Sequence, residues 1–152
     1  MSDARSMPGV TPNPYALPAT THAYLARSAE SLSEAVGAVD VPTRYACAHV
    51  AALRAAAALL AARARPTPAR RRPQKNAWVL LTEVAPELTE WASFFAAGAP
   101  KRAAAEAGST RAVSAREADD LVRDADRFLG VVERALGLVP HVGSAAPVSR
   151  AG

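Results

Sequence analysis

The feature that most constrains the fold is a stretch from Ala51 to Ala64 that consists almost entirely of alanine and leucine. Alanine has the highest helix propensity and buries little area, so we expect a helix that its neighbours approach closely. Asp40 can cap the start of this helix, and Pro42 is tolerated in its first turn, where backbone N–H groups have no helical partner. The pattern predicts a central helix that begins after Asp40 and ends near Arg65. Its apolar stripe is expected to consist of Val50, Leu53, Ala57 and Leu60.

One further helix is predicted before the central helix in the sequence, and one after it. The first runs from about Thr20 to Val36 and has an apolar face made of Leu25, Ala29, Leu32 and Val36. The second begins near Asn76 and carries the strongest core stripe of the chain: Trp78, Leu81, Val84, Leu88, Trp91 and Phe95. Pro86 interrupts this stripe, so we expect a kink or a break between Val84 and Glu87. Both tryptophans are interpreted as core residues.

The C-terminal third predicts a short helix and a long one. A short helix over Lys101 to Ala107 is closed by Gly108. Ser114 and Glu117 then form a capping box, which marks the start of the last helix. Its apolar face is expected to hold Ala118, Leu121, Val122, Ala125, Phe128, Leu129, Val132 and Leu136. Its other face is expected to be solvated and holds Asp119, Asp120, Arg123, Asp124, Asp126 and Arg127.

These elements predict an all-α fold, a four- to five-helix antiparallel bundle in one domain. No sustained period-two alternation competes with the helical pattern. We expect residues 19–137 to form the domain, with disordered tails over 1–18 and 138–152, since both ends hold proline among small residues.

Composition narrows the setting of the protein. Cys47 is the one cysteine in 152 residues, so neither an internal disulfide nor a cysteine metal cluster is expected. No apolar run reaches the length of a membrane helix, and the N-terminus does not resemble a signal peptide. We therefore expect a cytoplasmic protein that contacts no membrane. Its net charge of +4 permits nucleic-acid binding without requiring it.

A basic segment follows the central helix, from Arg63 to Lys75. It holds three prolines and no acidic residue, and its six basic residues are Arg63, Arg65, Arg70, Arg71, Arg72 and Lys75. One interpretation is a solvated linker whose arginines reflect a GC-rich genome. The other is an arm that holds the phosphates of RNA, although no aromatic residue is interleaved to stack on bases.

Few residues are candidates for chemistry. No P-loop, dinucleotide-binding or zinc-protease motif occurs, and the histidines His22, His49 and His141 are scattered, so we expect neither a metal nor another cofactor. The most compact pair is Arg44 and His49, five positions apart on the predicted central helix. Five residues at about 100° each place the two side chains roughly 140° apart, so one copy of the chain supplies an incomplete site.

The sequence blocks around that pair resemble a known family. They are Arg44–His49, Asn76–Leu81, Pro86–Ala92 and Ala115–Val122. The run from about Thr20 to Leu136 resembles an actinobacterial subfamily of the HEPN superfamily (higher eukaryotes and prokaryotes nucleotide-binding domains). The resemblance implies a four- or five-helix bundle that forms a homodimer. In nuclease members an arginine and a histidine from each subunit meet across the dimer interface and cleave RNA without a metal.

Carried over to this chain, the resemblance assigns roles to three residues. Arg44 would contact the scissile phosphate, and His49 would transfer a proton at the ribose 2′-hydroxyl or the leaving oxygen. Tyr45 stands where many active members have a polar residue, and its hydroxyl is the third candidate. The implied function is a metal-independent endoribonuclease with a toxin, defence or stress role.

One alternative to catalysis stays open. Arg44 can pair with a nearby acid such as Asp40, while His49 is half-buried in the bundle and has no catalytic role. The chain is then a non-catalytic interaction module, a partner of a nucleotidyltransferase antitoxin or of a DNA-repair assembly. The position of Arg44 and His49 discriminates between the two functions.

Overall fold

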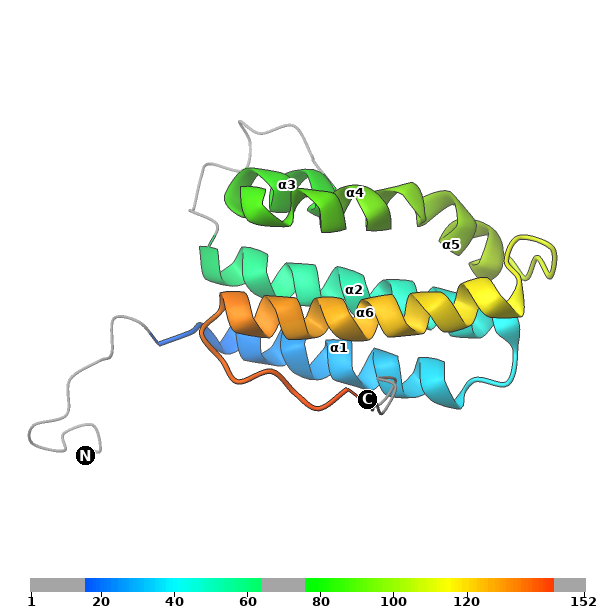
Figure 1. The fold of residues 1–152 in the computed structure, drawn as a ribbon, viewed down its shortest axis with the longest axis horizontal. Helices are drawn as coiled ribbons and strands as arrows, with labels where there is room; N and C mark the ends of the chain where they lie inside the picture. The colour runs from blue at the N-terminus through cyan, green and yellow to red at the C-terminus, as the bar shows by residue number, and fades with distance from the viewer. Residues whose placement is uncertain (1–15, 64–75, 144–152) are drawn as a thin grey trace, which may run out of the picture.

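The computed structural model describes residues 16–63 and 76–143 of the chain, and within these ranges it contains helices and no strand (Figure 1). The elements are α1 (Ala19–Gly37), α2 (Val41–Arg63), α3 (Ala77–Val84), the short 3₁₀ helix η3 (Pro86–Leu88), α4 (Thr89–Ala97), α5 (Ala99–Glu106) and α6 (Ala115–Ala135). The predicted all-α bundle is confirmed. The basic segment from residue 64 to 75 lies outside the described residues, as do residues 1–15 and 144–152 of the two expected tails.

The helices form an up-and-down bundle in which α2 is central. α1 runs antiparallel to α2, and α3, α4 and α5 follow one another as a broken rod on the far side of α2 (Figure 1). α6 returns in the same direction as α2 and packs against it (Figure 1). The predicted break falls where it was expected, since α3 ends at Val84 and Pro86 begins η3. The predicted short helix corresponds to α5, and Gly108 beyond it has a φ of 90°.

α1 and α2 meet through small side chains and hydroxyl groups. The Thr21 hydroxyl donates to the carbonyl of Ala58 at 2.9 Å, and the Ser28 hydroxyl donates to that of Ala51 at 2.7 Å. Both hydroxyl groups are buried. The two bonds are seven residues apart on each helix, so they recur after two turns of an antiparallel pair. Hydroxyl groups reach a neighbouring backbone in this way only when the two helices lie very close.

Two predicted apolar faces are only partly right, and this close packing explains the errors in both. On α1, Leu32 is buried and Leu25 packs partly buried against the core, as predicted, whereas Ala29 is exposed. The expected α2 stripe of Val50, Leu53, Ala57 and Leu60 is only half-buried, whereas the buried face consists mainly of alanines with Leu59. On α1, Val36 is 51% exposed, and Ala35 is buried instead. Periodicity predicted that the larger side chains face the core, but alanine, serine and threonine fill the places where α1 and α2 pack most closely.

The large side chains gather in an aromatic cluster between the broken rod and α6. It contains all three phenylalanines and both tryptophans of the chain: Trp78, Trp91, Phe94, Phe95 and Phe128. The ring centroid of Phe95 lies 5.1 Å from that of Phe128 and 5.2 Å from that of Trp78. The prediction that both tryptophans belong to the core is confirmed, since Trp78 is buried and Trp91 packs partly buried against the core. This cluster anchors α3 and α4 to α6.

α6 begins and packs largely as predicted. The Ser114 hydroxyl accepts from the Glu117 amide, and the Glu117 carboxylate accepts from the Ser114 amide, which confirms the capping box. The predicted apolar face is buried except at Leu136, which is half-buried. Asp126 departs from the prediction of a solvated face, because it is 6% exposed. Its partner is His141, one of the six described residues of the predicted C-terminal tail, 138–143.

α2 also corrects the expectation that no apolar run is long enough for a membrane helix. Among the helices of the described ranges, it alone passes a test of length and composition for a membrane span. Half of that stretch is buried inside the bundle, between α1, α6 and the broken rod. A central helix built from alanine and leucine has the same composition as a membrane helix, so burial accounts for this one.

Replacing Phe128 with alanine should lower the free energy of unfolding by about 3–5 kcal/mol, because the ring is fully buried at the centre of the aromatic cluster. Phe94→Ala is the control, because Phe94 belongs to the same cluster but is 47% exposed. We expect the control to cost less than half as much. Urea unfolding followed by circular dichroism measures both values, and equal losses would contradict the described core.

Candidate functional site

His49, the predicted proton-transfer residue, lies inside the bundle. It is 1% exposed, and its Nε2 lies 2.8 Å from the carbonyl oxygen of Phe95 near the end of α4. A carbonyl oxygen only accepts, so Nε2 carries the proton and donates it. The ring also makes edge contacts with Trp78 and Phe95. His49 therefore ties α2 to α4 at the edge of the aromatic cluster.

The surroundings of His49 favour its neutral form. Burial lowers the pKa of the imidazole, and the positive charge of Arg102 lowers it further. The hydrogen bond to Phe95 and the charge of Glu106 raise the pKa but do not offset burial. The other ring nitrogen, Nδ1, is buried and has no hydrogen-bond partner among the described residues. His49 is therefore a neutral imidazole with almost no exposed surface, and its one N–H is already donated to Phe95.

Arg44, the predicted phosphate-binding residue, joins three helices. Its Nη1 donates to Asp119 Oδ1 of α6 at 2.8 Å, and its Nη2 donates to the carbonyl of Ala38, which follows α1, at 3.1 Å. A guanidinium group at the carbonyl end of a helix also interacts favourably with the helix dipole. The acid that pairs with it is Asp119 rather than Asp40, whose carboxylate instead accepts from the Thr43 amide in the first turn of α2.

Tyr45, the third predicted residue, is 6% exposed and lies against the turn between α4 and α5. Burial raises the pKa of its phenol. A Cβ atom added to Gly98 would lie 3.0 Å from the Tyr45 hydroxyl and 3.4 Å from His49 Cδ2. The absence of a side chain at Gly98 is what lets the α4–α5 turn rest on both residues. Arg44 therefore points to the α1–α6 side of α2, whereas Tyr45 and His49 point to the α4–α5 side.

Of the predicted RNA-binding residues, the structure describes only Arg63. Its guanidinium donates to Glu87 at 2.7 Å and to the carbonyl of Val84 at 3.4 Å, so it ties α2 to η3 and the end of α3. The other predicted residues, Arg65, Arg70, Arg71, Arg72 and Lys75, lie outside the described residues.

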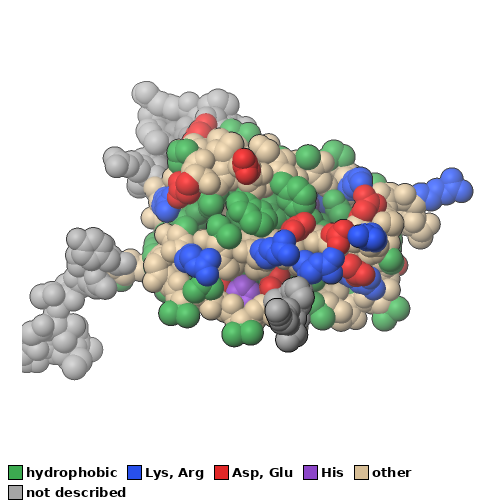
Figure 2. All heavy atoms as spheres, viewed as in Figure 1, with side chains coloured by type: hydrophobic (Ala, Val, Ile, Leu, Met, Phe, Trp, Pro, Cys, Tyr) green, Lys and Arg blue, Asp and Glu red, His purple; other side chains and the backbone are tan. Residues whose placement is uncertain are grey.

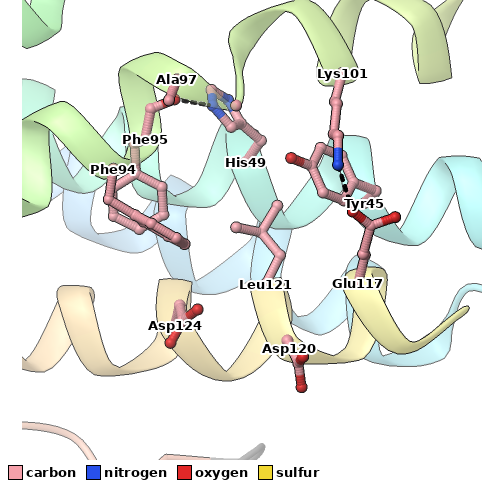
Figure 3. Close-up of a pocket in the computed structure, with 11 residues that line it drawn as sticks. Tyr45, His49, Phe94, Phe95, Ala97, Lys101, Glu117, Asp120, Leu121 and Asp124 are labelled. Atoms are coloured by element: carbon pink, nitrogen blue, oxygen red, sulfur yellow. Dashed lines mark hydrogen bonds and ion pairs between the residues drawn. The ribbon is translucent and has the colours of Figure 1, made fainter. Parts of the chain in front are cut away.

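An open cleft lies beside Tyr45 and His49, between the α4–α5 turn and the N-terminal half of α6. We call it the α4–α6 cleft; its volume is about 380 Å³. Its walls are Tyr45, His49, Phe94, Phe95, Ala97, Gly98, Lys101, Glu117, Asp120, Leu121 and Asp124. Figure 2 shows hydrophobic side chains lining the hollow between the broken rod and α6, with charges of both signs along α6. In Figure 3, Leu121 points from α6 towards His49, and the rings of Phe94 and Phe95 stand together at one end.

The charges of the cleft lie along its two edges. Lys101 on α5 and Glu117 on α6 form an ion pair across one end, and this contact lowers the pKa of the Glu117 carboxylate (Figure 3). Further along α6, Asp120 pairs with Arg123, while Asp124 lies 3.7 Å from Arg127. Burial raises the pKa of Asp124. The floor of the cleft is thus apolar. Its edges carry the carboxylates of Glu117, Asp120 and Asp124 and the single lysine Lys101.

The sequence analysis missed most residues of this cleft. Nothing in the spacing of Lys101 and Glu117, sixteen positions apart, predicts their contact. One signal was present at Phe94: a helix that buries Phe95 turns the preceding residue about 100° away from the core. Two adjacent phenylalanines therefore indicate that one of them faces a partly open surface.

The donor set for a metal is poor over residues 16–63 and 76–143. No group of three or more histidine, cysteine, aspartate or glutamate side chains is placed there to hold an ion. Cys47 is half-buried, and burial is the main cause of the raised pKa of its thiol. The cleft offers apolar side chains, rather than a set of metal ligands, for contact.

Comparison with known proteins gives one family. A family model described as SAV_6107-like HEPN matches residues 35–133, which is more than half of the 152-residue chain. The match begins at the end of α1 and covers α2 to nearly the end of α6. No curated protein and no solved structure matches the chain.

The burial of His49 predicts a pH dependence of stability. Its lowered pKa means that the unfolded chain binds a proton that the folded chain refuses, so the free energy of unfolding should fall as the pH drops below about 6.5. In His49→Leu this part of the slope, at most about 1.4 kcal/mol per pH unit, should vanish. Urea unfolding between pH 5 and 8 measures both slopes.

The control for this experiment is His22→Gln, because His22 is exposed on α1. Its slope should match that of the wild type. Other titrating groups act in the wild type and in the variant alike, so the difference in slope isolates His49. Parallel curves for wild type and His49→Leu would contradict the buried neutral imidazole.

Proposed function

The chain belongs to the SAV_6107-like HEPN family, and we propose that it is a non-catalytic module that binds a protein partner. The observation that carries the proposal is the state of His49. It is 1% exposed, and its one N–H donates to the Phe95 carbonyl. An imidazole used in this way holds helices together.

The contacts of Arg44 support the same proposal. Its guanidinium is committed to Asp119 and to the carbonyls that follow α1, and its side chain is 20% exposed. A phosphate would have to displace both partners. Catalysis of the kind implied by the family resemblance also requires His49 to leave Phe95, and hence the α4–α5 turn to move away from α2. The competing proposal, a homodimer that pools two Arg44–His49 pairs on RNA, requires both changes.

The α4–α6 cleft supports binding as the function. An apolar cleft of a few hundred cubic ångströms with a few polar groups at its edges is typical of a binding site. Phe94 is 47% exposed at its end, whereas Tyr45, Trp78, Phe95 and Phe128 are buried. The floor of Phe95, Leu121 and Tyr45 accepts one large apolar side chain of a partner.

The edges of the cleft favour a partner segment with basic residues next to that apolar anchor. Lys101 is neutralised by Glu117, and the other two carboxylates of the cleft are Asp120 and Asp124, whose side chains are 48% and 28% exposed. Their own arginine partners, Arg123 and Arg127, are at least 42% exposed and can be exchanged for those of a partner. In this proposal the protein acts in the cytoplasm, where the thiol of Cys47 stays reduced.

The proposal predicts that the purified protein does not cleave RNA. End-labelled single-stranded RNA is incubated with wild type and with His49→Ala in excess chelator. Both samples should leave the RNA intact. Cleavage by the wild type alone, with 2′,3′-cyclic phosphate ends, would overturn the proposal and assign catalysis to His49.

Binding at the cleft is tested by selecting from a library of random twelve-residue peptides on the wild-type protein. We expect enriched peptides that share an aromatic or large aliphatic residue beside lysine or arginine. Phe94→Asp should weaken their binding at least tenfold, because it places a charge at the end of the apolar floor.

The matched control for the peptides is Val79→Asp. Val79 is 44% exposed, nearly as much as Phe94, but lies on α3 and does not line the cleft. Its affinity for the selected peptides should equal that of the wild type. Absence of enrichment, or equal loss in the two variants, would contradict binding at the α4–α6 cleft.

A further inference from the structure

A short segment folds back on α6 after the helix ends. The chain reverses at Gly137, whose φ of 79° favours glycine, and the Leu138 amide donates to the carbonyl of Glu133 at 2.9 Å. Residues 138–143 then run back along the bundle beside α6 (Figure 1). We call these six residues the C-terminal strap. They lie outside the stretch matched by the family model.

His141 fastens the strap to α6 through both of its ring nitrogens. Nε2 lies 2.8 Å from Asp126 Oδ1, and Nδ1 lies 2.6 Å from Glu133 Oε1. The backbone N–H of His141 donates to the same Glu133 oxygen at 2.9 Å. Asp126 and Glu133 are seven residues apart, so they occupy one face of α6 two turns apart, and the imidazole spans the distance between them.

The side chains of this bridge are largely buried, and the strap lies close to α6. The side chains of Asp126 and Glu133 are only 7% and 14% exposed, and that of His141 is 28% exposed. A Cβ atom added to Gly143 would lie 1.9 Å from Asp126 Oδ2, so any other residue requires the strap or the Asp126 carboxylate to move. At Gly130 an added Cβ would lie 3.9 Å from Pro140, so a side chain larger than that of alanine would press on the strap.

The bridge requires a charged imidazole. An imidazole that donates to a carboxylate from each nitrogen carries both ring protons, whereas the neutral ring turns a lone pair towards one of the two carboxylates. Burial by itself lowers the pKa of His141, but the hydrogen bonds to Asp126 and Glu133, together with their charges, outweigh it and raise the pKa. The folded chain therefore holds this proton more tightly than the unfolded chain.

Other charged groups near the strap do not reproduce this arrangement. Arg127 and Arg134 of α6 line the cavity of about 360 Å³ next to the strap, together with Trp91 of α4. α1, which also packs on α6, carries His22, Arg27, Glu30 and Glu34 as its titratable or charged side chains apart from Tyr24. The two charges that act on the pKa of His141 are those of Glu133 and Asp126.

We propose that the C-terminal strap is a pH-operated latch, closed on α6 when His141 carries both ring protons and released when it loses one. Release uncovers the α6 surface from Asp126 to Glu133 and opens the cavity beside Trp91. Because the pKa of His141 is raised in the folded state, the stabilisation from closure is complete below about pH 6.5 and is lost as the pH rises through that raised pKa. The latch is independent of what binds in the α4–α6 cleft.

The test measures motion of the strap by NMR on the full ¹⁵N-labelled chain. Backbone N–H order parameters of the strap residues other than Pro140 should be near those of rigid helix, about 0.85, at pH 6 and fall below about 0.6 at pH 9. The titration of His141 Cε1 should have the same midpoint as the loss of order. The indole N–H signal of Trp91 should shift with that midpoint too.

Three variants separate the latch from a passive contact. His141→Gln should leave the strap mobile at both pH values, and Glu133→Gln should lower the midpoint; either variant serves if the other folds poorly. Gly143→Ala changes no titratable group and should loosen the strap at pH 6. His22→Gln, the control, should behave as the wild type does. A strap equally ordered at pH 6 and pH 9, or a switch that survives in His141→Gln, would overturn the proposal.

Discussion

The close contact between α1 and α2 determines which side of α2 can hold large side chains. Alanine and serine fill the seam, and hydroxyl groups of α1 donate to backbone carbonyls of α2. This leaves no room for large side chains on that side of α2, so the aromatic residues gather on the other side, between α3–α4 and α6. The core thus has two parts: closely packed small residues between α1 and α2, and the aromatic cluster between α3–α4 and α6. His49 stands at the edge of the aromatic half, which explains why it is enclosed.

Because the core is divided in this way, Arg44 and His49 have separate structural roles. Arg44 points to the small-residue side and connects the end of α1 to Asp119 of α6. His49 points to the aromatic side and holds the end of α4. About 140° of helix rotation separates the two side chains. The surface left open is the α4–α6 cleft, where the broken rod stands off from α6 beyond the aromatic cluster.

The sequence predicted those features that depend on neighbouring residues. The break at Pro86, the Ser114–Glu117 capping box and most of the aromatic stripe need only local rules, and all three are confirmed. The apolar faces of α1 and α2 were only partly right, because a pattern of large apolar side chains does not reveal where two helices pack closely through small ones. The partner of Arg44 is 75 positions away, and His141 meets Asp126 only after a chain reversal, so neither contact leaves a local pattern.

The central claim is that His49 is a neutral, buried link between α2 and α4, and ¹⁵N NMR of its ring nitrogens tests this most directly. We predict a titration midpoint below about 6.5, the Nε2–H tautomer above that midpoint, and no change in either nitrogen shift when a single-stranded RNA oligonucleotide is added. A titration midpoint at or above about 6.5, together with a shift on adding RNA, would contradict the account and return His49 to the role of a catalytic residue.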